Sequence, residues 1–257
     1  MNTVKYRGFE IQIEPDEISL NPRKEFDNAG TMVCFHGQYD LGDSHSFSAD
    51  NIKAELAEEF CPNLANTINY WNNDGYTRLA QKYSHDKAFR MVEAKIDKIA
   101  EKIIDRKAIV LPLYLYDHSG LTMRTGAPGW ESNRFGFIYI SREKAAIEWS
   151  DHPEFGTIEQ RAIRCMEGEV QVYDYYLTGQ VYGYMTKPVI ANKKINDDDS
   201  CWGFFGGDHE LSGLLECAKD AINGAIASYK KTAVAAALED RRRRREMAAF
   251  MKNCWAY

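Results

Sequence analysis

The chain has 257 residues, of which 44% are hydrophobic and 27% are charged, a balance typical of a folded globular protein rather than a disordered one. Its formal net charge of -6 argues against non-specific binding to duplex nucleic acid, which needs clustered Lys and Arg. No run approaches the roughly 20 apolar residues of a membrane span, and the first residues do not resemble a signal peptide, so we expect a cytoplasmic protein.

The N-terminal half of the chain predicts two strands followed by helices. Apolar residues alternate with polar ones from Val4 to Ile13, which indicates a strand, and a second strand is expected over Thr31–His36. Ser48 or Asp50 could cap a helix over Ile52–Phe60. Apolar residues then recur at helical spacing through residues 63–106, so we expect helices there.

The C-terminal half predicts more strands between helices. Ala108–Tyr116, Phe135–Ile140, Val181–Met185 and Cys201–Phe205 are short, apolar and aromatic, as strands often are. Helices are expected from Arg142 after a Ser141 cap, over Ile158–Tyr176, over Leu211–Tyr229 and over Thr232–Met251.

These elements predict an α+β fold with a mixed or antiparallel sheet and flanking helices. We expect one domain over residues 1–230, with a helical insertion at about residues 50–106 and a C-terminal basic helix over residues 231–257. The first three of the four C-terminal strands are expected to share a central sheet.

Two Asp-His steps follow predicted strands and mark a candidate site. Asp117-His118 follows one strand and Asp208-His209 another, and strand ends commonly carry functional side chains. We expect the two steps to lie on one face of the molecule. If the protein is an enzyme, Asp117, His118 and His209 are its candidate catalytic residues.

The same cluster has two possible interpretations. Histidines and carboxylates can bind a divalent metal or exchange protons, and His36, Asp40, Asp43 and His45 could join them. Asp and His are also common turn and cap residues, and Asp208 could cap the following helix. The structural interpretation is favoured, because no pair has a diagnostic metal-ligand spacing.

Known cofactor and metal motifs are absent from the sequence. It contains no Walker loop and no GxGxxG, and its six cysteines include no CxxC pair. The sequence therefore predicts neither a cofactor nor a zinc site, and it indicates reduced thiols.

A run of five arginines, Arg241, Arg242, Arg243, Arg244 and Arg245, is the most unusual charge feature. Either it lies on a solvated terminal helix, or it binds an acidic surface or a nucleic acid. We expect this helix to mediate self-association or to dock on a partner. Trp130 and Arg134 are further candidates for binding a phosphate or a base.

Several longer motifs resemble a family of uncharacterised proteins from phages and other mobile elements. The resemblance spans most of residues 4–230 and is carried by Asp27–His36, Tyr39–Asp43, Leu111–Gly120, Phe135–Ile140, Val172–Gly179 and Cys201–Gly206. It implies a phage or mobile-element origin and supplies no catalytic residues.

Two functions are consistent with these features. The first is a phage-encoded interaction protein that binds and inhibits a host protein, such as a CRISPR or restriction-type component of a bacterial immune system. An acidic surface can occupy a basic nucleic-acid site by presenting charge as phosphates do. The second is a metal-assisted hydrolase of a nucleotide or nucleic acid. We favour the interaction protein, because the sequence contains no recognisable catalytic signature.

Overall fold

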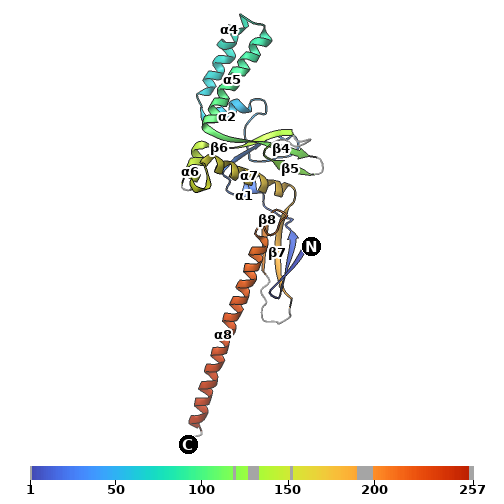
Figure 1. Cartoon of the computed structure of the whole chain (residues 1–257), viewed down its shortest axis with the longest axis vertical. Coiled ribbons are helices and arrows are strands. Elements are labelled where there is room, and N and C mark those ends of the chain that lie inside the picture. Colours follow the sequence, from blue (N-terminus) through green and yellow to red (C-terminus); the bar gives the residue numbers. More distant parts are fainter. Residues whose placement is uncertain (1, 118–119, 127–132, 151–152, 190–198, 255–257) are drawn as a thin grey trace. The chain divides into compact units, whose positions relative to one another are not determined.

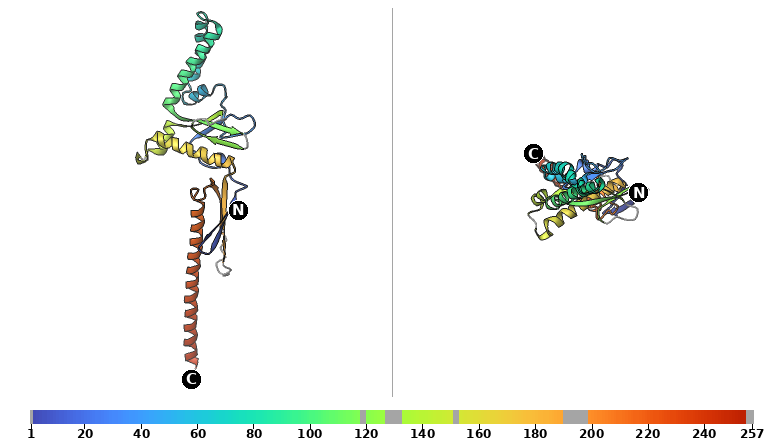
Figure 2. Two further views of the ribbon diagram at one scale, coloured as in Figure 1. Left: turned by 45° about the vertical axis from the view of Figure 1, so that its right-hand side comes forward. Right: turned by 90° about the horizontal axis from the view of Figure 1, so that it is seen from above.

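The computed structural model describes residues 2–117, 120–126, 133–150, 153–189 and 199–254. Within them the chain forms two antiparallel four-stranded sheets, each packed against helices (Figures 1 and 2). This arrangement confirms the α+β class predicted from the sequence. Within the described residues, none of the helices combines the length and apolar character that crossing a bilayer requires.

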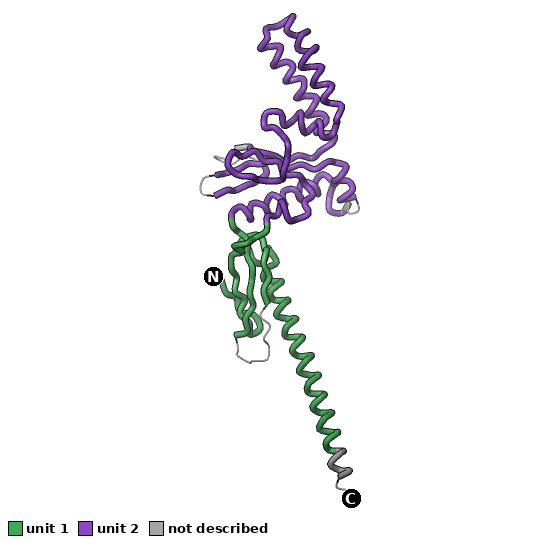
Figure 3. The backbone as a smooth tube through the Cα atoms, turned by 180° about the vertical axis from the view of Figure 1, so that it is seen from behind, with its two compact units in different colours: residues 1–20, 179–257 green, residues 21–178 purple. Residues whose placement is uncertain are grey.

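The chain divides into two compact units rather than the one domain expected over residues 1–230 (Figure 3). Unit 1 combines Met1–Leu20 with Gly179–Tyr257, and unit 2 is the intervening Asn21–Thr178. The boundary expected at residue 230 falls inside a continuous helix. Sequence patterns did not reveal the division because unit 1 is built from two distant segments of the chain.

Unit 2 is built on a sheet with the strand order β3-β6-β4-β5. Its strands are β3 (Thr31–Cys34), β4 (Ala108–Asp117), β5 (Leu121–Arg124) and β6 (Asn133–Ser141). The long helix of unit 2 is α7 (Ile158–Leu177). The unit also contains the shorter helices α1 (Pro22–Glu25) and α6 (Arg142–Trp149) and the 3-10 turn η2 (Pro153–Phe155). Ser141 caps α6 as expected, because its hydroxyl accepts a hydrogen bond from Lys144 N.

Alternating residues of this sheet enter two different hydrophobic clusters. Ile138 and Ile140 pack with Met166 and other residues of α7. Phe137 and Tyr139, which alternate with them, pack instead with Leu56 of helix α2 (Ile52–Phe60). Because successive side chains of a strand point to opposite faces, helices cover both faces of the sheet.

Helices occupy the chain between β3 and β4. After α2 come α3 (Leu64–Tyr70), the π-helical turn η1 (Trp71–Gly75), α4 (Tyr76–Ala80) and α5 (His85–Lys107). The segments from α3 to α4 run back alongside α5, and together they form a helical hairpin that extends away from the sheet (Figure 2).

Unit 1 contains a sheet with the strand order β1-β2-β7-β8 and one long helix. Its strands are β1 (Asn2–Tyr6), β2 (Phe9–Pro15), β7 (Val181–Pro188) and β8 (Asp199–Phe205), and its helix is α8 (Leu214–Cys254). The expectation that β7 shares a sheet with β4 and β6 is therefore wrong. Phe9, Ile11, Ile13 and Tyr184 of the sheet pack against Leu214, Ala218 and Ile222 of α8.

Two boundaries in unit 1 differ from the sequence prediction. The strand expected over Val4–Ile13 is a hairpin, because Arg7 and Gly8 both have positive φ angles, of 48° and 86°. Such a pair forms the two-residue turn that joins tightly paired strands. The helices expected over Leu211–Tyr229 and Thr232–Met251 are one helix, since no proline or glycine interrupts Lys230-Lys231-Thr232.

The Cys201–Gly206 motif has a packing role in this sheet. Gly183 of β7 lies under the ring of Trp202 of β8, and a Cβ atom at Gly183 would come within 2.2 Å of that ring. Gly183 therefore makes room for Trp202, which covers the exposed backbone of the neighbouring strand.

Candidate binding groove

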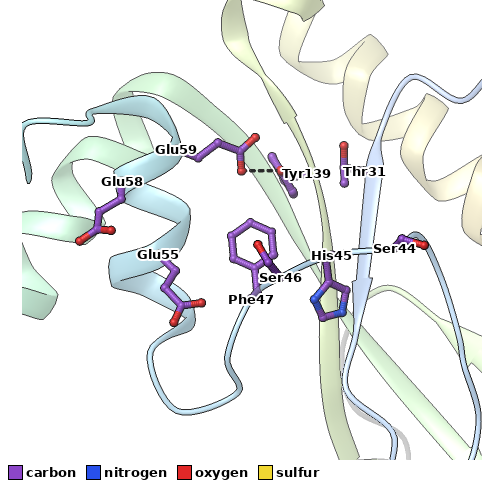
Figure 4. A pocket seen from close by; sticks show the side chains of 9 residues that line it. All are labelled: Thr31, Ser44, His45, Ser46, Phe47, Glu55, Glu58, Glu59 and Tyr139. Carbon is purple, nitrogen blue, oxygen red and sulfur yellow. Dashed lines mark hydrogen bonds between the residues drawn. The ribbon is translucent and has the colours of Figure 1, made fainter. Parts of the chain in front are cut away.

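A groove of about 690 Å³ opens in unit 2 between α2, the loop after β3, and β6 (Figure 4). Its lining combines carboxylates, hydroxyl groups and aromatic rings, from Thr31, Ser44, His45, Ser46, Phe47, Glu55, Glu58, Glu59 and Tyr139. We call this surface the acidic groove, because it contains three glutamates and no lysine or arginine.

All three glutamates belong to helix α2, and their spacing places them on the same side of it. Glu58 and Glu59 follow Glu55 by three and four residues, which places all three on one side of a helix. Leu56 and Ala57, on the other side, are fully buried. The buried pair anchors α2 to the core and leaves the glutamates on its other side, where they contribute to the groove lining. Glu59 points toward Tyr139, and Glu58 points away from it (Figure 4).

Two of the glutamates are held by hydrogen bonds. Ser48 N donates to Glu55 Oε2 over 2.6 Å, and the Tyr139 hydroxyl donates to Glu59 Oε2 over 2.6 Å. Burial raises the pKa of Tyr139, and the bond to Glu59 raises it further, so the phenol keeps its proton and remains a donor. The Glu58 side chain has no hydrogen bond or ion pair among the described residues, and its carboxylate is available to a ligand.

His45 adds a nitrogen atom without a partner. Its Nε2 lies 3.0 Å from the carbonyl oxygen of Cys34, and because a carbonyl only accepts, Nε2 carries a proton. Its Nδ1 is buried and has no hydrogen bond. The ring packs against Phe35 and Phe47, with centroid distances of 5.1 and 5.9 Å. In the neutral imidazole Nδ1 is thus an unsatisfied acceptor, which costs roughly 1–3 kcal/mol.

The chemistry of the acidic groove favours a cation that donates several hydrogen bonds. Carboxylate oxygens accept hydrogen bonds, and the aromatic rings offer faces to a planar group. A guanidinium or ammonium group has this complementary character. An anion would be repelled by the three glutamates.

The predicted Asp-His cluster is brought together only in part. His36 Nε2 lies 3.7 Å from Asp117 Oδ2, and His36 Nδ1 accepts hydrogen bonds from the backbone N atoms of Gln38 and Tyr39. His36 and Asp117 therefore form a pair at the end of β4. His118 lies outside the described residues.

Asp43 belongs to a buried ion-pair network rather than to a site. Arg23, whose side chain is 1% exposed, donates to both carboxylate oxygens of Asp43 and, over 2.8 Å, to Glu169 Oε2. Burial lowers the pKa of Arg23, but Asp43 and Glu169 outweigh it and the pKa is raised overall. Asp40, by contrast, is 93% exposed at its side chain and lies 4.0 Å from Lys24 Nζ.

Asp208 and His209 belong to unit 1, whereas Asp117 belongs to unit 2. Asp208 Oδ1 accepts hydrogen bonds from the backbone N atoms of Glu210 and Leu211, which lower its pKa. Asp208 thus fixes a turn ahead of α8 rather than capping the helix, which begins at Leu214. His209 packs edge-on against Tyr182.

The predicted binding residues are found in several places. Arg241–Arg245 lie on the exposed part of α8. The backbone of Arg134 lies in β6, but its side chain is not among those described, and Trp130 lies outside the described residues. Among the residues that the structure describes, no group of three or more His, Cys, Asp or Glu is placed to hold a metal ion.

The acidic groove was not predicted from the sequence. The signal was present in Glu55-Leu56-Ala57-Glu58-Glu59, where acidic and apolar residues separate onto two sides of a helix. Such a pattern is common on solvated helices, so it did not stand out. Tyr139 and His45 could be placed beside it only by the fold.

No protein-family model, no curated protein and no solved structure matches this chain.

Proposed function

We propose that this protein is an interaction protein, which binds a positively charged segment of another protein in the acidic groove. The observation that carries this proposal is the unpaired carboxylate of Glu58 beside Glu55 and Glu59 in a hollow of about 690 Å³. Three carboxylates in one hollow attract a cation, and Lys and Arg side chains are the cations that protein surfaces supply.

The partner is, in this proposal, a host protein that binds nucleic acid, and binding inhibits it in the cytoplasm of the host cell. Two features support this. The motifs in residues 4–230 resemble those of phage and mobile-element proteins, and the net charge of -6 suits a protein that competes with phosphates. The partner's basic segment, occupied by the acidic groove, would then be closed to nucleic acid.

The alternative of a metal-assisted hydrolase has less support. It would depend on the His36–Asp117 pair, whose 3.7 Å separation provides two candidate groups but no third metal ligand among the described residues. The acidic groove instead has three glutamates in its lining, and their carboxylates match a cationic partner.

The first experiment measures cation binding directly. A fluorescein-labelled arginine-rich peptide is titrated with the full-length protein, and anisotropy is recorded at low and high salt. Glu58→Lys should raise the dissociation constant at least about tenfold, because it replaces attraction with repulsion at the groove. The Glu58 side chain forms no hydrogen bond or ion pair among the described residues, so this change is not expected to disturb the fold.

The matched control is Glu167→Lys on α7. Glu167 is exposed, lies in the same unit and has no partner among the described residues, but it does not line the acidic groove. Its effect on peptide binding should stay below about twofold at physiological salt, where exposed charges are screened over about 8 Å. Equal losses in both variants would contradict the proposal and show attraction by net charge alone.

The second experiment tests inhibition of a host protein. Bacterial lysate is passed over wild-type, Glu58→Lys and Glu167→Lys proteins, and captured proteins are identified by mass spectrometry. We expect a nucleic-acid-binding protein to be retained by the wild type and the control but not by Glu58→Lys. Its nucleic-acid binding should fall when wild-type protein is added. A captured protein that still binds nucleic acid fully would contradict the inhibitor role.

A further inference from the structure

Helix α8 changes its surroundings along its length. Leu214, Ala218 and Ile222 are buried against the sheet of unit 1, whereas every side chain from residue 231 to residue 248 is exposed. Figure 3 shows this part of the helix extending past the strands of its own unit. Most helices gain their stability from packing, so a long helix with no packed face is an unusual element to retain.

The arginine run on α8 is only partly neutralised. Arg242, Arg243 and Arg244 form ion pairs with Glu246, Glu239 and Asp240, each four residues away along the helix. Arg241 and Arg245 have no carboxylate four residues away and no partner among the described residues. Two arginines therefore remain available to another molecule.

These two arginines share one side of the helix with exposed apolar residues. A helix turns about 100° per residue, so Val234, Leu238, Arg241 and Arg245 fall within about 60° of each other around its axis. Val234 and Leu238 are 59% and 61% exposed. Arg242, Arg243 and Arg244, the paired arginines, lie outside this stripe.

The same stripe continues toward the N-terminal end of α8 with the opposite charge. Glu216 and Asp220 lie on it and are exposed, followed by Asn223 and Ala227. We call the line from Glu216 to Arg245 the α8 stripe. It is acidic at one end and basic at the other, with Asn223, Ala227, Val234 and Leu238 between the two ends.

A hollow lies beside the acidic end of the α8 stripe. It has a volume of about 370 Å³ and is lined by Glu210, Glu216 and Asp220, together with Tyr6, Leu215, Lys219 and Asn223. Glu216 and Asp220 form no ion pair among the described residues. The hollow offers two free carboxylates to an incoming guanidinium group.

We propose that two copies of this chain pair through their α8 stripes in antiparallel orientation. Glu216 and Asp220 are four residues apart, and so are Arg241 and Arg245. A two-fold axis between residues 230 and 231 therefore places Glu216 against Arg245 of the second copy and Asp220 against Arg241. In the same register Val234 meets Ala227, and Leu238 meets Asn223, whose Oδ1 accepts hydrogen bonds from Tyr6 and Arg7 of its own unit.

Charge selects the antiparallel orientation and the second copy as partner. In a parallel pair in the same register, Arg241 and Arg245 would face the same arginines, and Glu216 and Asp220 would face the same acids. Such like-charge contacts are unfavourable, whereas the antiparallel pair has four pairs of opposite charges. A surface that is complementary to itself under a two-fold rotation is the signature of a closed homodimer.

The contact is long and narrow, which sets its expected strength. The α8 stripe from Glu216 to Arg245 spans about 45 Å at 1.5 Å per residue. It has few large apolar side chains, and Lys230 and Lys231 approach their equivalents near the axis. The dimer should therefore be reversible and should weaken as salt screens the charges.

The test uses charge reversal in the full-length protein, with mass measured by sedimentation equilibrium over a range of concentrations. The wild type should show a reversible monomer–dimer equilibrium. The double variants Arg241→Glu/Arg245→Glu and Glu216→Arg/Asp220→Arg should each raise the dimer dissociation constant at least about tenfold. An equimolar mixture of the two variants should form a heterodimer, because every opposed pair then has opposite charges.

The matched control is Arg243→Glu/Arg244→Glu, which makes the same change in charge outside the α8 stripe. It should dimerise with nearly the wild-type constant. Circular dichroism should show wild-type helix content in both stripe variants, and it measures any helix that the control loses with its ion pairs to Glu239 and Asp240. A monomeric wild type, wild-type dimerisation by both stripe variants, or an equal loss in the control would overturn the proposal. Recovery in the mixture also shows that each double variant is folded.

Discussion

The Tyr139 hydroxyl donates a hydrogen bond of 2.6 Å to Glu59 Oε2 and so links β6 to α2 at the acidic groove. Tyr139→Phe removes this link and leaves the carboxylate in place. We expect it to lower the free energy of unfolding by about 1 kcal/mol, the usual net value of one hydrogen bond. Binding of the arginine-rich peptide should not weaken, because Glu59 keeps its charge and loses an internal competitor. Urea unfolding and anisotropy measure the two effects.

Tyr175→Phe is the control for that variant. The Tyr175 hydroxyl accepts a hydrogen bond of 2.8 Å from Gln171 within the exposed side of α7, away from the acidic groove. Its loss should cost below about 0.5 kcal/mol, as for most surface changes. A larger loss for Tyr175→Phe than for Tyr139→Phe would contradict the importance of the β6–α2 link.

Arg23 should be among the residues on which the stability of unit 2 depends most. It joins the loop after α1, the loop after β3 and helix α7 through Gly30 O, Asp43 and Glu169. Arg23→Ala leaves two carboxylates in the interior without their cation, which costs about 3–5 kcal/mol. Arg142→Ala breaks the Arg142–Glu159 pair, whose side chains are 38% and 50% exposed, and should cost less than about 1 kcal/mol. Urea unfolding of both variants compares them, and equal costs would refute the prediction.

The strands and helices could be read from the sequence, but their partners could not. Ala108–Tyr116 and Phe135–Ile140 were apolar enough to identify, and they pair in β4 and β6 as expected. Val181–Met185 has the same apolar character, yet β7 pairs with β2 and β8. Strand pairing between distant segments depends on packing over the whole chain, whereas local pattern reports only the element itself.

Asp174 gives a pH dependence with a defined sign. Burial raises the pKa of its carboxyl, although the hydrogen bond from Met123 N and the charge of Arg124 oppose the shift. Stabilisation from a raised pKa is complete below the unfolded-state pKa and is lost as pH rises through the folded-state pKa. Asp174→Asn keeps an acceptor for Met123 N without the charge. It should be more stable than the wild type at pH 7, and the difference should disappear as pH falls below the unfolded-state pKa of about 3.9.

Glu159→Gln should show the opposite sign. Arg142 lowers the pKa of Glu159 by a hydrogen bond and by its charge. The wild type should therefore be the more stable protein at pH 7, and this advantage should fade as pH falls through the folded-state pKa of Glu159. Urea unfolding across a pH series measures both variants. The same sign for Asp174→Asn and Glu159→Gln would refute the assignment.

The thiol of Cys34 should be inert in the folded protein. It is buried in β3, and burial, followed by the charge of Asp43, raises its pKa to about 12. Only a thiolate reacts readily with iodoacetamide, so the folded protein should be alkylated at the exposed Cys217 and not at Cys34. Mass spectrometry locates the modified residues. Urea should make Cys34 reactive, and rapid modification without urea would contradict its burial.

The candidate site was less predictable than the fold, for a reason visible in His36 and Asp43. Both stood in one polar motif, but His36 lies beside Asp117 and Asp43 is occupied by Arg23. Sequence spacing identifies residues able to do chemistry, whereas their partners come from segments far apart in the chain. The partner of Asp43, Arg23, also binds Glu169, which lies 146 positions away in the chain, and no local sequence pattern indicated either contact.

The discontinuity of unit 1 has a consequence for the order of synthesis. The β1–β2 hairpin leaves the ribosome before unit 2, but the strand that pairs with β2 is Val181–Pro188, made only after all of Asn21–Thr178. Unit 2 is continuous, so it has all its residues before β7 exists and can fold on the nascent chain. During that interval β2 has an unpaired edge, the kind of surface on which strands of other chains assemble. Slow translation through unit 2 would therefore prolong the period in which newly made chains are prone to aggregate.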